Sequence, residues 1–78
     1  MKDNLNDGEM RVRAYSKKEL AVAYSPELSV SGASKRLLEW MKRNPHLWSE
    51  LKATGYRPKQ QVLTPQQVSI IFRYLGKP

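Results

Sequence analysis

The stretch that decides the fold is residues 16–43, SKKELAVAYSPELSVSGASKRLLEWMKR. It opens on Ser16-Lys17-Lys18-Glu19, the S-x-x-E spacing of a capping box, in which the serine hydroxyl accepts from the backbone N–H three residues on and the glutamate accepts from the serine N–H. Ser25-Pro26 ends this helix, because proline cannot continue the hydrogen-bond ladder. The pattern predicts a short helix, a turn and a longer basic helix, which together make a helix-turn-helix.

The second helix is predicted over residues 32–43, and it separates into two arcs when its residues are placed about 100° apart. A basic arc opposite an apolar arc is typical of a helix that reads a DNA groove, with its first residues near the bases and its later cations near the phosphates. The alternative is a solvated face on which Glu39 pairs with Lys35 and Arg43, each pair contributing about 0.2–0.5 kcal/mol. The apolar arc holds Ala33, Leu37, Trp40 and Met41, with Leu38 at its margin, and the polar arc holds Lys35, Arg36, Glu39, Lys42 and Arg43, with Ser34 nearer the helix start.

Composition sets the class of protein. Seventy-eight residues suffice for one domain, and the lack of cysteine excludes disulfides and thiolate zinc sites. Residues 1–9 are polar and acidic, which predicts a disordered tail before a single domain at 10–78. No run approaches the roughly 18 apolar residues of a membrane span, and the N-terminus lacks the apolar region of a signal peptide. We therefore expect a cytoplasmic protein that does not bind membranes.

The charge is unevenly distributed along the chain. The net charge is +7, while the first ten residues carry one basic and three acidic side chains, so the remaining residues carry +9. A small domain with this excess attracts polyanions, with nucleic acid first and acidic protein surfaces second. The alternative is that lysine and arginine only keep the domain in solution.

Two segments outside the helix pair are predicted to be extended. Residues 10–15 alternate apolar and basic, which is typical of a short strand. Residues 56–63 are too short and polar for a helix, and we expect them to pair with that strand and to present charge as the wing of a winged helix does. The alternatives are edge-strand charges that discourage aggregation for the first segment and a plain loop for the second. The basic residues concerned are Arg11 and Arg13 on the first segment and Arg57 and Lys59 on the second.

Two further helices have strong start signals. Asn44-Pro45 predicts a helix over residues 45–54, stopped by Gly55. Thr64-Pro65 predicts another, which ends at Gly76 and whose outer face includes Gln67. Its apolar residues fall at i, i+3, i+4 and i+7. The predicted fold is mainly α: four short helices with a helix-turn-helix-like pair and a minimal two-stranded sheet. The apolar stripe of the last helix is Val68, Ile71, Phe72 and Leu75.

The segment from Arg11 to Pro78 resembles a family of small uncharacterised basic proteins from Bacteroides-type bacteria. That resemblance implies no activity or site residues. A remoter likeness, carried by Ser16 to Ala21 and by the order of elements, is to the helix-turn-helix of mercury-resistance-type and excisionase-type DNA binders. The linker of residues 26–30 and the extra helix at 45–54 depart from that pattern. The family likeness is carried by Arg13-Ala14-Tyr15-Ser16-Lys17-Lys18-Glu19-Leu20-Ala21, Tyr24-Ser25-Pro26, Leu37, Trp40-Met41, Asn44-Pro45, Leu51, Thr54-Gly55-Tyr56, Thr64-Pro65-Gln66-Gln67-Val68 and Tyr74-Leu75-Gly76.

We predict a non-catalytic module that binds duplex DNA, as an accessory factor in transcription or in a mobile element. The alternative is an adaptor for an acidic protein partner, or one whose contact is an apolar patch of Trp48, Tyr56 or Tyr74. A homodimer fits either function. No enzyme, cofactor or small-molecule substrate is expected, because His46 is the only histidine and no catalytic or metal-ligand set accompanies it. The predicted nucleic-acid contacts are Arg11, Arg13, Ser34, Lys35, Arg36, Lys42, Arg43, Arg57 and Lys59.

Overall fold

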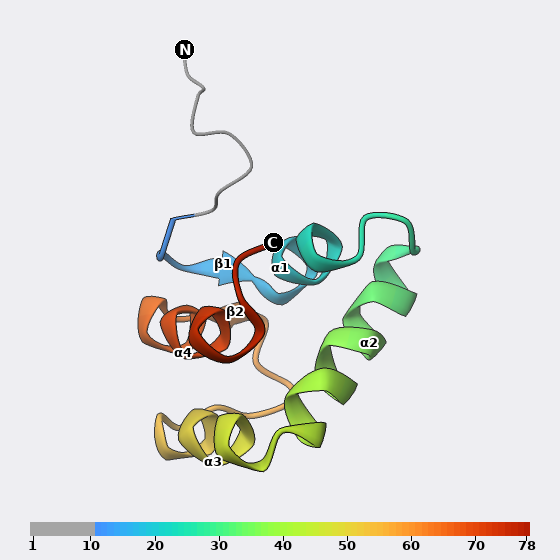
Figure 1. Ribbon diagram of the computed structural model, residues 1–78. Helices are drawn as coiled ribbons and strands as arrows, with labels where there is room; N and C mark the ends of the chain where they lie inside the picture. Colours follow the sequence, from blue (N-terminus) through green and yellow to red (C-terminus); the bar gives the residue numbers. More distant parts are fainter. Residues whose placement is uncertain (1–10) are drawn as a thin grey trace.

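A computed structural model describes residues 11–78. The predicted tail at residues 1–9 and the first residue of the predicted strand lie outside the described part. The mainly α architecture is confirmed, with four helices and a minimal sheet (Figure 1). In chain order the elements are β1 (Tyr15–Ser16), α1 (Lys17–Tyr24), α2 (Val30–Arg43), α3 (Pro45–Ala53), β2 (Val62–Leu63) and α4 (Pro65–Leu75).

Side-chain caps open all four helices. The predicted capping box of α1 is present, with Glu19 N–H donating to Ser16 Oγ at 3.0 Å and Ser16 N–H donating to Glu19 Oε1 at 3.0 Å. In α2 the cap is Ser29, whose Oγ accepts from Gly32 N–H at 3.1 Å, so this helix begins at Val30, two residues before the predicted start. Asn44 and Thr64 cap α3 and α4 in the same way.

The core lies where the four helices meet. Figure 1 shows α2 running along one side of the molecule, from α1 at its start to α3 at its end, with α3 and α4 side by side. The buried row of α2, Ala33, Leu37 and Met41, packs into this core. Burying one large aliphatic side chain stabilises a fold by about 1.5–3 kcal/mol, so the apolar rows fix the orientation of α2. The other fully buried aliphatic side chains include Leu20, Leu47, Leu51, Leu63, Val68 and Ile71.

The sheet is shorter than predicted. β1 pairs antiparallel with β2, Tyr15 opposite Leu63 and Ser16 opposite Val62, which confirms that the two predicted segments meet. Residues 11–14 belong to no strand, because the Tyr15 hydroxyl donates to the Arg11 carbonyl at 2.6 Å and turns the chain back on itself.

Residues 57–60 form a turn, in which Gln60 N–H donates to the Arg57 carbonyl at 3.0 Å. The predicted extended arm is therefore wrong for this part of the segment, and the loop alternative is right.

Within residues 11–78 no helix combines the length and the apolar character needed to cross a membrane.

Candidate nucleic-acid interface

The exposed surface of α2 divides into two flanks, one on each side of its buried row. Residues spaced by three, four or seven share one side of a helix. The first side, the lysine flank, consists of Ser34, Lys35, Leu38 and Lys42, and the second, the tryptophan flank, consists of Arg36, Trp40 and Arg43. The cations predicted on this helix are shared between these two flanks, and the exposed Glu39 lies between them.

The lysine flank borders a hollow of about 170 Å³ between α1 and α2, which Lys17 of α1 helps to line. Lys35 and Lys42 are exposed, and within residues 11–78 neither forms an ion pair or a side-chain hydrogen bond. Glu39 pairs with neither Lys35 nor Arg43 in the same part of the chain. The alternative of a self-neutralised helix face is therefore not what the structure shows. The other residues that line the hollow are Ser34, Lys35, Leu37, Leu38 and Met41.

The turn at residues 57–60 lies beside the lysine flank. Lys17, which lines the hollow, donates through Nζ to the Pro58 carbonyl, forty-one residues away in the sequence. Arg57 and Lys59 stand exposed on either side of Pro58, and their side chains form no hydrogen bond or ion pair with the described residues. The fold thus brings a second, separate pair of cations towards Lys35.

A buried amide holds this turn in place. Gln67 is 2% exposed, which contradicts the prediction that it faces water. Its Nε2 donates to Thr54 Oγ1 at 2.9 Å, and its Oε1 accepts from Thr64 N–H at 3.0 Å and from Gln60 Nε2 at 2.5 Å. Gln60 Nε2 also donates to the Val62 carbonyl at 2.7 Å. The turn is therefore tied to α3, α4 and β2. The T-x-x-Q spacing of a second capping box was the sequence signal for the inward reach of Gln67.

Arg36 is engaged within the fold. Its Nη1 donates to Glu27 Oε2 at 3.0 Å and to Ser25 Oγ at 3.2 Å, and its guanidinium lies 5.7 Å from the centre of the Trp40 ring. A hydrogen bond from the backbone of Glu27, followed by the one from Arg36, lowers the pKa of the Glu27 carboxyl. Arg36 therefore fastens the connection between α1 and α2. Arg43, on the same flank, borders a second hollow together with Trp40.

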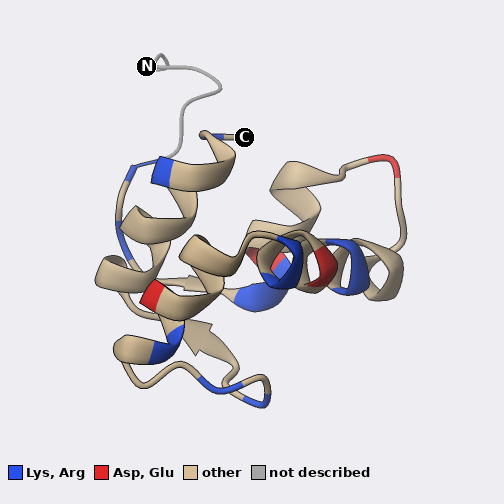
Figure 2. Cartoon of the chain, turned by 60° about the horizontal axis from the view of Figure 1, so that its bottom comes forward, with Lys and Arg blue, Asp and Glu red and all other residues tan. Residues whose placement is uncertain are grey.

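Arg11 and Arg13 lie in another region, before β1. The Arg13 guanidinium stacks 3.8 Å above the Tyr15 ring and donates to the Ala14 carbonyl at 2.7 Å. Arg13 borders a hollow on the outer side of α1, together with Lys18. Figure 2 shows basic residues spread over many elements of the described chain. Of the nine predicted contacts, Ser34, Lys35 and Lys42 lie on the lysine flank, and Arg57 and Lys59 lie on the turn that Lys17 contacts. Arg36 and Arg43 lie on the tryptophan flank, and Arg11 and Arg13 lie before β1.

The aromatic residues also differ from the prediction. Tyr56 is buried, 5% exposed, and its ring meets the edge of Trp48 with the centroids 5.8 Å apart. Its surroundings raise the pKa of its hydroxyl through desolvation. Tyr56 is therefore a core residue and not part of a contact patch, whereas Trp48 and Tyr74 remain half-buried. His46 is exposed, and within residues 11–78 no group of histidine, aspartate and glutamate side chains could hold a metal ion.

The comparisons with known proteins identify the family. A family model described as "Domain of unknown function (DUF4248)" matches residues 11–78. The chain belongs to this family. The matched segment contains all four helices and both strands, so the DUF4248 domain comprises the whole described fold. No curated protein and no solved structure matches the chain.

Proposed function

We propose that the chain binds duplex DNA without catalysis, through the lysine flank of α2 and the neighbouring turn at residues 57–60. The observation that carries this proposal is a set of four exposed cations, two on α2 and two on the turn, that form no ion pair within residues 11–78. Lys17 of α1, which lines the hollow beside Lys35, contacts the turn at the Pro58 carbonyl. Such cations replace condensed counterions on phosphates, which is the main source of affinity in this class of protein. The four cations are Lys35, Lys42, Arg57 and Lys59.

The dimensions of α2 fit a DNA groove. Its 14 residues span about 21 Å at 1.5 Å per residue, and Lys35 lies about 10 Å along the axis from Lys42. The major groove, about 12 Å wide, admits one helix. Ser34 and Lys35, in the first half of α2, would lie nearest the bases, while Lys42 and the turn would contact phosphates on either side.

The order of elements supports the same function. A capped α1 precedes the basic α2, and a basic turn and β2 precede α4, as in the helix-turn-helix of mercury-resistance-type and excisionase-type DNA binders. α3 is an addition between α2 and the turn. We infer a cytoplasmic accessory factor of transcription or of a mobile element in Bacteroides-type bacteria, although fold alone does not determine function.

Fluorescence anisotropy with a labelled duplex at several salt concentrations tests the proposal. Four neutralised phosphates give a log–log slope of about −3.6, and Lys35→Ala should bring it to about −2.7 and weaken binding to all sequences alike. Lys18→Ala is the matched control, because Lys18 is exposed on the outer side of α1. A slope near zero, or equal losses in the two variants, would contradict the proposal.

A further inference from the structure

A groove of about 550 Å³ opens on the tryptophan flank, where the end of α2, the start of α3 and the end of α4 meet. None of its lining residues is acidic. Trp40 and Leu75 supply apolar surface, Tyr74 supplies an aromatic ring, and Arg43 supplies a cation. The lining residues are Trp40, Arg43, Asn44, Pro45, Tyr74 and Leu75.

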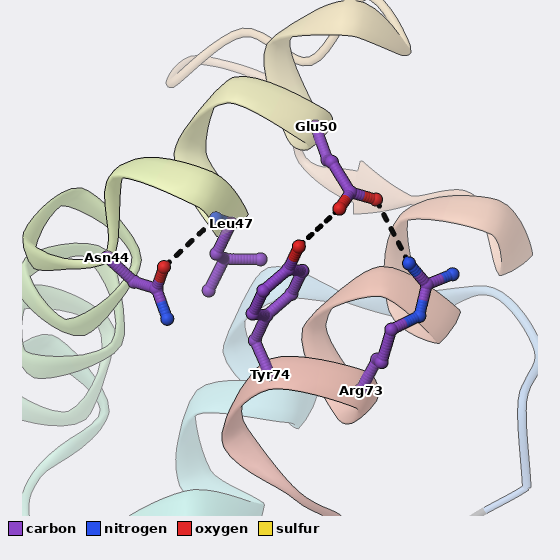
Figure 3. A network of polar contacts seen from close by, with 5 residues as sticks. All are labelled: Asn44, Leu47, Glu50, Arg73 and Tyr74. Atoms are coloured by element: carbon purple, nitrogen blue, oxygen red, sulfur yellow. Dashed lines mark hydrogen bonds and ion pairs between the residues drawn. The ribbon is translucent and has the colours of Figure 1, made fainter.

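The two aromatic side chains of the groove are held by their neighbours. Figure 3 shows the Tyr74 hydroxyl donating to Glu50, whose other oxygen accepts from Arg73 Nη1 at 3.1 Å. On the other side, Trp40 meets Tyr24 edge to face, with the ring centroids 6.1 Å apart and the planes at 88°, and the Tyr24 hydroxyl donates to the Gly76 carbonyl. A groove with fixed side chains loses little conformational entropy when a ligand enters it.

The polar groups of the groove differ in their availability. Asn44 is engaged, because its Oδ1 caps α3 by accepting from Leu47 N–H at 3.1 Å (Figure 3). The nearby carboxylate of Glu50 is engaged by Arg73 and Tyr74. Arg43 is exposed and forms no ion pair within residues 11–78. The available charge of the groove is therefore positive.

We propose that this groove docks an acidic, amphipathic segment of a partner protein, with an apolar side chain between Trp40 and Tyr74 and a carboxylate on Arg43. Aromatic residues and arginine are the residue types that dominate binding energy at protein interfaces, and complementary charge selects the partner. This function goes beyond DNA binding: the chain would hold DNA on the lysine flank and a protein on the tryptophan flank.

Two labelled twelve-residue helical peptides test the proposal. Both carry two leucines and one phenylalanine on one side, and on the other side one carries four glutamates and the other four lysines. Each is titrated into the full chain, with affinity read by anisotropy and position read by the NMR shift of the Trp40 indole N–H. We expect the glutamate peptide to bind and to shift the Trp40 signal. Arg43→Glu should weaken the affinity for the glutamate peptide at least tenfold and make the lysine peptide the preferred ligand.

Lys42→Glu is the matched control, since it makes the same charge change at the preceding residue on the opposite flank. Lys42→Glu should leave the affinity for the glutamate peptide within about twofold and reduce the affinity for the duplex. Arg43→Glu should reduce the affinity for the glutamate peptide and leave the affinity for the duplex nearly unchanged. Equal binding of the two peptides, no binding of either, or equal losses in the two variants would overturn the groove proposal. Loss of duplex binding alone would overturn only the proposed function, because the peptide measurements do not involve DNA.

Discussion

Each flank of α2 carries two cations, but the surroundings of these cations differ. Lys35 and Lys42 on the lysine flank have no ion partner in the described part of the chain, whereas Arg36 on the tryptophan flank is bound to Glu27 and Ser25. The difference arises because the connection between α1 and α2 passes the tryptophan flank and places a carboxylate there. Charge on a helix is therefore available for a ligand only where neighbouring segments leave it unpaired.

The largest expected effect comes from the row that both flanks share. Leu37→Ala removes a buried side chain, 4% exposed, and should lower the free energy of unfolding by roughly 2–5 kcal/mol. Urea denaturation measures this change, and both the duplex and the peptide affinity should fall as the fold loosens. Leu38→Ala is the control: Leu38 is half-buried beside the hollow of the lysine flank, so its loss should cost less and should spare the peptide. Equal costs would mean that the buried row and the lysine flank do not differ in burial.

The next effect separates the flanks. Gln67→Leu keeps the size of the side chain but removes its hydrogen bonds with the Thr54 hydroxyl, the Thr64 N–H and the Gln60 amide. The expected loss of stability is about 1–3 kcal/mol. The turn at residues 57–60 should then move, so duplex affinity should fall while affinity for the glutamate peptide persists. Gln66→Leu, at the exposed neighbouring position, should change neither stability nor duplex affinity. A loss of peptide affinity in Gln67→Leu would contradict the independence of the two flanks.

A smaller effect concerns the support of the tryptophan flank at high pH. Burial raises the pKa of Tyr24 to about 12 from its ordinary value of 10.0. Because the pKa of Tyr24 is higher in the folded state, the stability that its neutral hydroxyl contributes is complete below pH 10 and is lost as the pH rises through about 12. Each pKa unit corresponds to about 1.4 kcal/mol, and solvent around a half-buried group reduces this, so we expect a total loss of about 1 kcal/mol. In Tyr24→Phe the free energy of unfolding should fall less between pH 10 and pH 12. If stability depended on pH in the same way in both proteins, this prediction would be wrong.

The smallest effect tests the ion pair that distinguishes the flanks. The folded-state pKa of Glu27 is lowered, so its stabilisation is present above the ordinary carboxyl pKa and is lost as the pH falls through the lowered value. Glu27→Gln should lower the melting temperature at pH 7 by less than Gln67→Leu does, because both partners are exposed. The difference from the unchanged protein should shrink as the pH falls below the ordinary carboxyl pKa and through the lowered pKa of Glu27. Glu39→Gln makes the same charge change at a residue of α2 that forms no ion pair within residues 11–78. Its melting temperature, measured by circular dichroism, should show no such pH-dependent difference.

The starts of α1, α3 and α4 and most of the core rows were predictable from short-range patterns. The caps Ser16, Asn44 and Thr64 act on backbone groups three residues away, and the apolar row of α4 recurs with the helical period. The strand predicted at residues 10–15 is shorter in the structure, where residues 11–14 are not in β1, because alternation does not show that the Tyr15 hydroxyl reaches back to the Arg11 carbonyl.

The site was less predictable, because its parts are distant in the sequence. Lys17, Gln60 and Gln67 were not among the predicted contacts, although they position the turn. Trp40 was predicted as core, yet it is half-buried and lines a groove. The assignment of Arg36 to the DNA contacts rested on its place on the helix, which does not show that Glu27 and Ser25 bind its guanidinium.

The sequence by itself determined where the helices begin and end and that the domain carries a large excess of positive charge. Both properties depend on composition or on interactions within about one helical turn. Tertiary structure decided which cations remain unpaired, because Arg36 meets Glu27 across a loop and Arg73 meets Glu50 from another helix. It also buried Gln67 and Tyr56, since exclusion of water depends on every element that packs around a side chain.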